Sequence, residues 1–182
     1  MTGIDKSAPA PGDSCPALEE SAAELVAELA ARGARVAVAE SLTGGLVTAQ
    51  LTGIPGASRV LNGGIVAYNT TVKTTLLGVS AELLARCGAV NTDVARQMAV
   101  GVCRALAVSG RPSELGISTT GVAGPAPQDG VNPGVVFLGI AWRGGVRAIP
   151  LSLSGDRAEI RTAATAAAIT EALRAVRMPV TR

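Results

Sequence analysis

The stretch VAVAESLTGG, from Val36 to Gly45, decides how the rest of the sequence is interpreted. Its first half is a short apolar run, which is typical of a buried β-strand, and its second half is polar and ends in two glycines. This order predicts a strand, a turn and then a helix, with Ser41 in the turn at the carboxyl end of the strand. Open α/β sheets bind ligands at that edge, so this turn is a candidate functional site.

The same alternation of short apolar runs and helical patterns continues along the chain. It predicts an α/β fold, specifically a three-layer α/β/α sandwich around a mostly parallel or mixed central sheet. The apolar spacing and the Gly, Asn and Asp signals at the ends predict helices at 17–32, 44–53, 70–78, 80–88, 91–108 and 156–176. Strands are predicted at 35–40, 63–68, 115–124, 134–142 and 147–154.

Length and composition indicate one domain. A chain of 182 residues with 48% hydrophobic residues is long enough for a single substantial core. Residues 1–16 are rich in Pro, Gly, Ser and Asp and bury too little apolar surface to order themselves, so we predict a flexible tail there. Residues 17–182 are predicted to form the single domain.

The charge of the chain and its content of metal-binding residues limit which partners and cofactors are expected. The net charge is +2 and no basic block is present, so binding to nucleic acid or to an anionic membrane is not expected. The chain has no histidine, and Cys15, Cys87 and Cys103 are widely spaced, so we expect reduced thiols and no metal or cofactor. No apolar run approaches the roughly 20 residues of a membrane span, and we expect a cytoplasmic protein.

The absence of histidine makes the two lysines informative. A nucleophilic Ser41 needs a base, and the alternative to imidazole is a neutral lysine amine. Of the 16 basic residues only Lys6 and Lys73 are lysines, and Lys6 lies in the expected tail. Lys73 lies in the first turns of a predicted helix, where the dipole disfavours a cation. Because an amine can lose its proton and a guanidinium cannot, Lys73 is the candidate base.

Other residues near this pair are candidates for assisting roles. Tyr68, the only tyrosine, stands five residues before Lys73 and can relay a proton or fix the pair geometrically. Glu40 adjoins Ser41 but points to the opposite face of the strand, which favours an orienting hydrogen bond over attack chemistry. The backbone N–H groups of Thr43, Gly44 and Gly45 begin the next helix and are candidates for holding an oxyanion or a phosphate.

Two further stretches are candidates for holding a substrate. The loop TTGVAGPAPQDGVNPG (119–134) has the glycines and prolines of a shaped pocket wall, including Gly121 and Gly124. In SGDRAEIR (154–161), Arg157 and Arg161 are four residues apart on one helix face, where paired guanidinium groups can grip a phosphate.

Each of these features also has a purely structural interpretation. Ser41 and Thr43 can simply cap a helix, and Lys73 can be an exposed side chain whose stem lies along the surface. Tyr68 can be an aromatic residue at the core edge with a solvated hydroxyl. The loop can be an ordinary long connection, and the two arginines can belong to a solvated basic face.

The segments VAVAESLTGG, AYNTTVK, CGAV, STTGVAGP and SGDRAEIR, in this order, resemble the CinA C-terminal domain family of nicotinamide-nucleotide amidases. The similarity runs from about Ala17 to Ala175. It implies an α/β/α sandwich that hydrolyses nicotinamide mononucleotide to nicotinate mononucleotide and ammonia in pyridine-nucleotide salvage. A homodimer is a further expectation from the resemblance.

The resemblance also implies roles for individual residues. The family's A-E-S-x-T-G-G falls on Ala39 to Gly45, and its Y-x-x-x-x-K falls on Tyr68 and Lys73. The predicted catalytic residues are therefore Ser41, Lys73 and Tyr68. The residues predicted to bind the substrate are Glu40, Thr43, Gly44, Gly45, Asn69, Gly121, Gly124, Arg157 and Arg161.

One segment departs from the family pattern and keeps other functions open. After Gly124 the loop reads PAPQDGVNPG, where family members usually carry a glycine-rich segment and Lys-Pro-Val-Gly. Substrate contacts made by that loop are therefore expected to differ. The alternatives are an amidase for another small amide and a non-catalytic nucleotide-binding or competence- and damage-related regulatory module.

Overall fold

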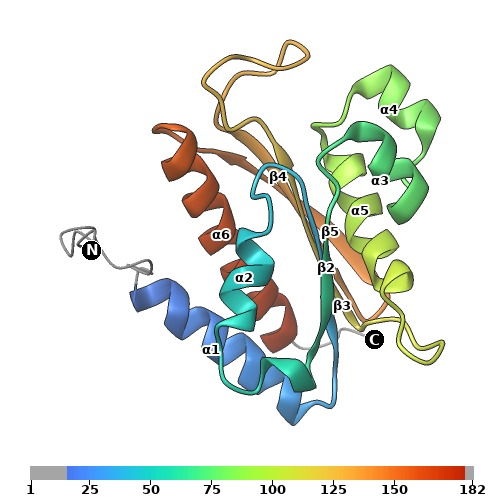
Figure 1. Cartoon of the computed structure of the whole chain (residues 1–182), viewed down its shortest axis with the longest axis vertical. Helices are drawn as coiled ribbons and strands as arrows, with labels where there is room; N and C mark the ends of the chain where they lie inside the picture. Colours follow the sequence, from blue (N-terminus) through green and yellow to red (C-terminus); the bar gives the residue numbers. More distant parts are fainter. Residues whose placement is uncertain (1–15, 179–182) are drawn as a thin grey trace, which may run out of the picture.

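A single five-stranded sheet runs through the middle of the molecule in the computed structural model, which describes residues 16–178 (Figure 1). Its strands are β1 (Val36–Glu40), β2 (Leu61–Val66), β3 (Leu115–Gly121), β4 (Val135–Trp142) and β5 (Gly145–Ser152). They lie in the order β2-β1-β3-β4-β5. β1 is parallel to β2 and to β3, whereas β4 is antiparallel to β3 and to β5. The sheet is therefore mixed.

Helices cover both faces of this sheet. They are α1 (Pro16–Ala31), α2 (Leu46–Thr52), α3 (Thr70–Leu77), α4 (Ala81–Cys87), α5 (Thr92–Ala105) and α6 (Arg157–Arg177), with a short 3-10 helix, η1 (Ala57–Arg59). Figure 1 shows α1, α2 and α6 on one face and α3, α4 and α5 on the other. This arrangement is the three-layer α/β/α sandwich predicted from the alternating sequence pattern.

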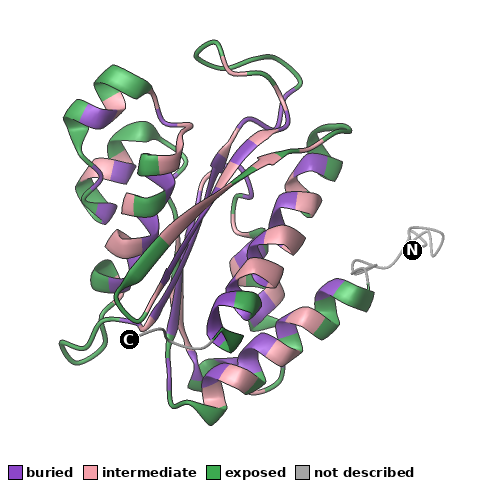
Figure 2. Cartoon of the chain, turned by 180° about the vertical axis from the view of Figure 1, so that it is seen from behind, coloured by how far each residue is buried: buried purple, intermediate pink, exposed green. Residues whose placement is uncertain are grey.

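Strand β1 is central to both hydrophobic cores because all five of its residues are buried. Val36 and Val38 pack into the core shared with α1, α2 and α6, whereas Ala37 and Ala39 pack into the smaller core next to α3 and α5. Figure 2 shows the corresponding band of buried residues along the sheet between the two helix layers. The alternation sends successive side chains of β1 to opposite faces, as expected for a strand.

The predicted elements match the structure with shifts of a few residues at their ends. The helix predicted from Gly44 begins at Leu46, because Gly44 and Gly45 have positive φ angles of 62° and 103°. The helix predicted to reach Val108 ends at Ala105, where the chain turns into a tight Val108–Arg111 bridge.

The strand predicted at 147–154 contains a proline. The position of this strand in the sheet explains why the proline is tolerated. Pro150 lies on β5, which is an edge strand paired only with β4. A proline has no N–H to donate, and an edge position leaves one side of the strand without a ladder partner. The strand is therefore able to form despite the proline.

Several predictions concern the ends and the surface of the chain. The flexible tail predicted for residues 1–16 lies outside the described residues, apart from Pro16, which begins α1.

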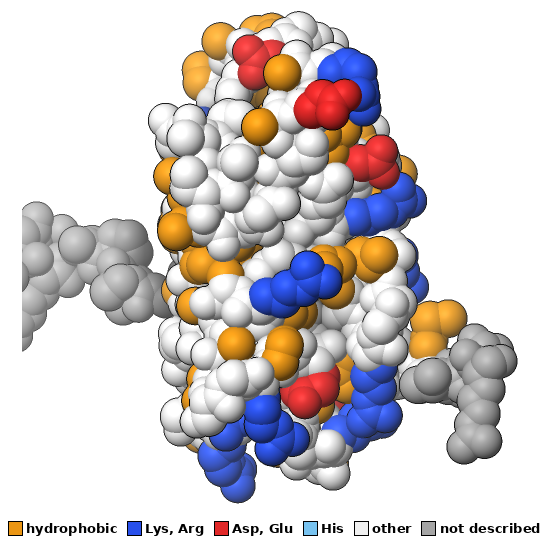
Figure 3. All heavy atoms as spheres, turned by 90° about the vertical axis from the view of Figure 1, so that its right-hand side faces the viewer, with side chains coloured by type: hydrophobic (Ala, Val, Ile, Leu, Met, Phe, Trp, Pro, Cys, Tyr) orange, Lys and Arg blue, Asp and Glu red, His pale blue; other side chains and the backbone are white. Residues whose placement is uncertain are grey.

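Among the helices within residues 16–178, none combines the length and the apolar character needed to cross a membrane. On the face shown in Figure 3, basic and acidic side chains are interspersed among uncharged ones.

Candidate active site

Ser41 lies in a tight turn at the carboxyl end of β1. The Ser41 N–H donates to the carbonyl of Thr119 on the neighbouring strand β3, at 3.0 Å, and the Gly44 N–H donates to the Ser41 carbonyl at 3.1 Å. The hydroxyls of Thr43 and Thr119 are 2.7 Å apart and join the same two segments. The turn is therefore fixed to the sheet on one side and closed on itself on the other.

Lys73 approaches this turn from α3, which begins two residues after Tyr68. The Asn69 side chain caps α3 by accepting the Thr71 N–H at 2.8 Å, so the helix starts where the sequence predicted. The Lys73 amine Nζ lies 3.0 Å from Ser41 Oγ and 2.6 Å from the carbonyl oxygen of Ala67. Only 1% of Lys73 is exposed, which contradicts the interpretation of Lys73 as a surface lysine.

Burial sets the protonation behaviour of this amine. Removal from water disfavours the ammonium form and lowers the pKa of Lys73 to about 8. A neutral amine can donate one N–H to the Ala67 carbonyl and direct its lone pair at the Ser41 hydroxyl. The pair therefore has the geometry and the proton affinity of a nucleophile with its base.

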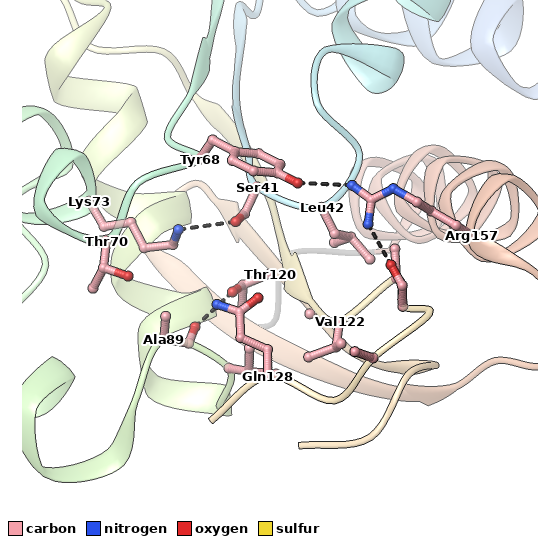
Figure 4. Close-up of a pocket in the computed structure, with 15 residues that line it drawn as sticks. Ser41, Leu42, Tyr68, Thr70, Lys73, Ala89, Thr120, Val122, Gln128 and Arg157 are labelled. Carbon is pink, nitrogen blue, oxygen red and sulfur yellow. Dashed lines mark hydrogen bonds between the residues drawn. The ribbon is translucent and has the colours of Figure 1, made fainter. Parts of the chain in front are cut away.

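A cavity of about 120 Å³ opens beside the Ser41 hydroxyl. Figure 4 shows its walls, with Tyr68 and Gln128 on opposite sides of the Ser41–Lys73 pair. In this described part of the chain, the lining residues include no Asp or Glu. The residues that line the cavity are Ser41, Leu42, Tyr68, Thr70, Lys73, Ala89, Val90, Thr120, Gly121, Val122, Ala123, Gly124, Ala126, Gln128 and Arg157.

Arg157 and Tyr68 form the mouth of this cavity. The Arg157 guanidinium donates to the Tyr68 hydroxyl at 2.9 Å and to the Gly124 carbonyl at 2.7 Å (Figure 4). Tyr68 is 61% exposed, and among the described residues its hydroxyl bonds with neither Ser41 nor Lys73. The phenol therefore lies beside the Ser41–Lys73 pair with its hydroxyl turned towards the arginine.

Glu40 faces α2 rather than the cavity. Its fully buried carboxylate accepts the N–H groups of Gly45, Val47 and Thr48 at 2.8–3.1 Å, and the Thr48 hydroxyl at 2.6 Å. The negative charge lies at the positive end of the helix dipole. Glu40 thus makes the orienting hydrogen bonds expected of it, but their partner is the start of α2, and Glu40 does not line the cavity.

The backbone of the turn differs from the predicted oxyanion site at its glycines. The Gly44 N–H is bonded to the Ser41 carbonyl and the Gly45 N–H to Glu40, because these bonds close the turn and cap α2. Neither glycine N–H is therefore available to a ligand. In contrast, the N–H groups of Leu42 and Thr43 donate to no other described residue.

The two arginines predicted to grip a phosphate have different partners. Arg157 lines the cavity, whereas Arg161 donates to the carbonyls of Leu42 and Thr43, behind the Ser41 turn. Of the predicted substrate-binding residues, Gly121, Gly124 and Arg157 line the cavity. Those that do not line it are Glu40, Thr43, Gly44, Gly45, Asn69 and Arg161.

Three contributors to the site were not singled out from the sequence, although two of them, Thr120 and Gln128, belong to the 119–134 stretch predicted to line a pocket. Thr120 lines the cavity and its hydroxyl donates to the Ala89 carbonyl at 2.7 Å, which ties β3 to the segment before α5. Gln128 reaches the cavity from the long loop, and the Ala67 carbonyl holds the lysine amine. The polar run STTG at the end of a strand was a usable signal for Thr120, whereas a backbone carbonyl leaves no signal in sequence.

The described residues contain few side chains grouped as metal ligands. Within residues 16–178, no group of three or more Cys, Asp or Glu side chains is placed to hold a metal ion.

Comparison with known proteins identifies relatives of this chain. The family described as "CinA C-terminal domain" matches residues 18–176. A CinA-like protein from Anaeromyxobacter sp. (strain Fw109-5) is 48% identical over 149 residues, covering 81% of this chain and 35% of that protein. A CinA-like protein from Frankia casuarinae is 45% identical over 141 residues, covering 78% and 31%. The chain spans about a third of the length of these curated relatives.

Solved structures of similar length have the same fold. A competence/damage inducible protein from Agrobacterium tumefaciens is 33% identical, with a TM-score of 0.80 over 94% of this chain and 99% of that one. A competence-damaged protein (CinA) superfamily protein from Enterobacter cloacae is 25% identical, with a TM-score of 0.83 over 93% and 98%. By its sequence match and its fold, the chain belongs to the CinA C-terminal domain family.

Proposed function

We propose that this chain is an amidase that hydrolyses the carboxamide of nicotinamide mononucleotide to nicotinate mononucleotide and ammonia. The observation that carries the proposal is the 3.0 Å approach of the buried Lys73 amine to the Ser41 hydroxyl, at the wall of a cavity. The resemblance of the surrounding motifs to nicotinamide-nucleotide amidases supplies the substrate. On the same ground we assign the reaction to pyridine-nucleotide salvage, and the widely spaced cysteines, expected to be reduced thiols, favour the cytoplasm.

The first half of the reaction forms an ester on Ser41. Ser41 Oγ attacks the carboxamide carbon while its proton passes to the neutral Lys73 amine. The carbonyl oxygen becomes an oxyanion, for which the N–H of Leu42, a residue that lines the cavity, is the available backbone donor of the Ser41 turn. The tetrahedral intermediate collapses, the C–N bond breaks, and the proton held by Lys73 goes to the departing ammonia.

The second half returns the enzyme to its starting state. A water molecule attacks the ester carbon, gives one proton to Lys73, and displaces Ser41 Oγ. That proton then returns to the serine hydroxyl and the carboxylic acid is released. The electron-withdrawing pyridinium ring of the substrate favours both attacks on the attached carbonyl carbon.

The size of the cavity indicates how a mononucleotide would lie. Its volume of about 120 Å³ is smaller than the roughly 300–1,000 Å³ of typical ligand pockets. Only the nicotinamide end would enter, and the ribose phosphate would lie in the open mouth. Arg157 at this mouth is the cation available for the phosphate, and the exposed Tyr68 ring is available beside the pyridinium.

The deciding experiment is incubation of the purified chain with nicotinamide mononucleotide, with ammonia and nicotinate mononucleotide measured together. Equal amounts of both products support the proposal. The Ser41→Ala variant should remain folded and release ammonia at least about a hundredfold more slowly, since a nucleophile acting with its base is lost. Near-normal turnover by this variant would remove Ser41 from the mechanism.

The same assay distinguishes the competing functions. An amidase for another small amide would release ammonia from nicotinamide riboside or a simple aromatic amide but not from the mononucleotide. A non-catalytic nucleotide-binding module would bind the mononucleotide, as measured by calorimetry, and release no ammonia from any of them.

A further inference from the structure

Arg161 holds the backbone of the Ser41 turn from the side of α6. Its Nε donates to the Leu42 carbonyl at 3.0 Å, and its terminal NH2 group donates to the Thr43 carbonyl at 2.8 Å. No carboxylate pairs with this guanidinium among the described residues. The positive charge of Arg161 is therefore directed at the turn itself.

The glycine at position 44 allows this close approach. A Cβ atom added at Gly44 would lie 3.2 Å from the Arg161 NH2 group, and the φ angle of Gly44 is +62°. A side chain there would strain the backbone and crowd the guanidinium. The lack of a side chain at Gly44 thus leaves room for the Arg161 guanidinium, although 117 positions separate the two residues.

The carbonyls that Arg161 binds belong to the two central residues of the turn. In a trans peptide the C=O and the N–H point in opposite directions, so a Leu42 carbonyl held towards Arg161 turns the Thr43 N–H away from it. The Leu42 and Thr43 N–H groups are the ones that donate to no other described residue. The Thr43 carbonyl shares its peptide group with the Gly44 N–H, which donates to the Ser41 carbonyl, and that carbonyl shares its peptide group with the free Leu42 N–H. Arg161 is therefore joined to the Leu42 N–H through the hydrogen bond that closes the turn.

We propose that Arg161 is a positioning residue that holds the Ser41 turn so that the N–H of Leu42, which lines the cavity, is ready for the oxyanion formed at Ser41. This inference rests on the proposed acyl transfer to Ser41. A hydrogen bond from a cation to the Thr43 carbonyl also polarises that peptide group, which strengthens the Gly44 N–H as a donor to the Ser41 carbonyl and, through it, the Leu42 N–H. The planar guanidinium spans two carbonyls at once, whereas a lysine ammonium is a single point charge.

The test compares Arg161→Ala and Arg161→Lys with wild type in two assays. The first measures kcat and KM for nicotinamide mononucleotide. The second measures labelling of Ser41 by a fluorophosphonate probe, in which Ser41 Oγ displaces fluoride from phosphorus and its proton passes to Lys73. The probe places an oxygen in the same oxyanion site but needs no amide substrate. Ser41→Ala provides the unlabelled blank.

We expect kcat and the labelling rate to fall at least about tenfold in Arg161→Ala, with KM within about twofold. Losing one oxyanion donor outright costs 10²–10³ in kcat, and a loosened turn should cost part of that. Arg161→Lys should restore less than half of the loss. Guanidinium ion added at millimolar concentration should partly restore the rate of Arg161→Ala and leave Arg161→Lys unchanged.

Arg147→Ala is the matched control for a merely structural role. Arg147 also donates to a backbone carbonyl on another element, that of Glu171, at 3.0 Å at the far end of α6. This variant should lower the melting temperature and leave Ser41 labelling unchanged. If Arg161→Ala does not fold, the Arg161→Lys comparison carries the test.

The outcomes separate this inference from the proposed function. Wild-type labelling of Ser41 in Arg161→Ala, with only the stability lowered, would overturn the positioning role. A raised KM with unchanged kcat would overturn it as well and assign Arg161 to substrate binding. Labelling that falls in Arg161→Ala while wild type releases no ammonia from the mononucleotide would support Arg161 and reject the proposed substrate. Failure of wild-type Ser41 to be labelled would reject both.

Discussion

The amine of Lys73 lies 3.0 Å from the hydroxyl of Ser41, although the two residues are 32 positions apart and belong to different elements. Two features of the fold produce this contact. The parallel pairing of β1 with β2 brings the chain after β2 beside the end of β1. The Ala67 carbonyl oxygen then accepts a hydrogen bond from Lys73 Nζ at 2.6 Å, which holds the amine next to the serine.

The pH dependence of activity should follow the amine of Lys73. Burial lowers its pKa to about 8, and the neutral form is the one that can accept the serine proton. Below pH 8 the amine is mostly protonated, so kcat/KM should fall about tenfold per pH unit as the pH drops. Above pH 8 it should level off. Measurement of kcat/KM from pH 6 to 10 checks this, and a profile flat through pH 8 contradicts it.

Replacement of Lys73 by arginine should abolish activity nearly as well as replacement by alanine. Arginine keeps the positive charge but cannot give up its proton at any accessible pH, so the general base is lost. The rate of ammonia release should therefore fall on the order of a hundredfold or more. Ammonia release by Lys73→Arg and Lys73→Ala, at pH 9 and with folding checked by circular dichroism, tests this. An arginine variant that keeps most of the activity would make Lys73 an electrostatic anchor only.

Arg157→Ala should weaken binding of the phosphorylated substrate selectively. A lost charge-assisted hydrogen bond is worth about 1.5–3 kcal/mol, so KM for the mononucleotide should rise about tenfold or more. The rate on nicotinamide riboside should barely change, because this substrate carries no phosphate. Arg174→Ala, an exposed residue of the same helix that pairs with Glu171, is the control. Equal effects on both substrates would mean that Arg157 only shapes the mouth through Tyr68 and Gly124.

Glu40→Ala should destabilise the protein through α2. The substitution leaves four donors without their buried acceptor, those of Gly45, Val47 and the two from Thr48. A single unsatisfied buried donor costs about 1–3 kcal/mol, so the free energy of unfolding should fall by at least about 2 kcal/mol. Urea denaturation measures it. Glu82→Ala, which removes an exposed ion pair, should change it by less than about 0.5 kcal/mol. Similar stability of the two variants would contradict this account.

Much of the fold is visible in sequence because it rests on local patterns. The run Val36–Glu40 alternates between two cores, as its short apolar pattern predicts. Asn69, Asn91 and Asp156 cap their helices as such side chains usually do. These features depend on neighbours within a few residues, so periodicity and capping signals predict them.

The candidate pair Ser41 and Lys73 was also predictable, from residue choice rather than from geometry. A chain without histidine that uses arginine almost everywhere singles out its one lysine beyond the N-terminal segment. The sequence had no means of distinguishing a buried amine from a surface one, since both occur on amphipathic helices. Burial at 1% exposure is a property of how α3 packs against the sheet.

The arginines show most clearly what the tertiary structure alone decided. Arg157 and Arg161 share one face of α6, and the sequence treats them as equivalent. Four residues of helix separate them by about 6 Å along the axis, at 1.5 Å per residue. That displacement places Arg157 at the cavity mouth and Arg161 behind the Ser41 turn. Sequence by itself determined the elements and singled out the candidate residues Ser41 and Lys73. The packing of α6 on the sheet determined which backbone groups each arginine reaches, because such contacts depend on distances between elements that local patterns do not encode.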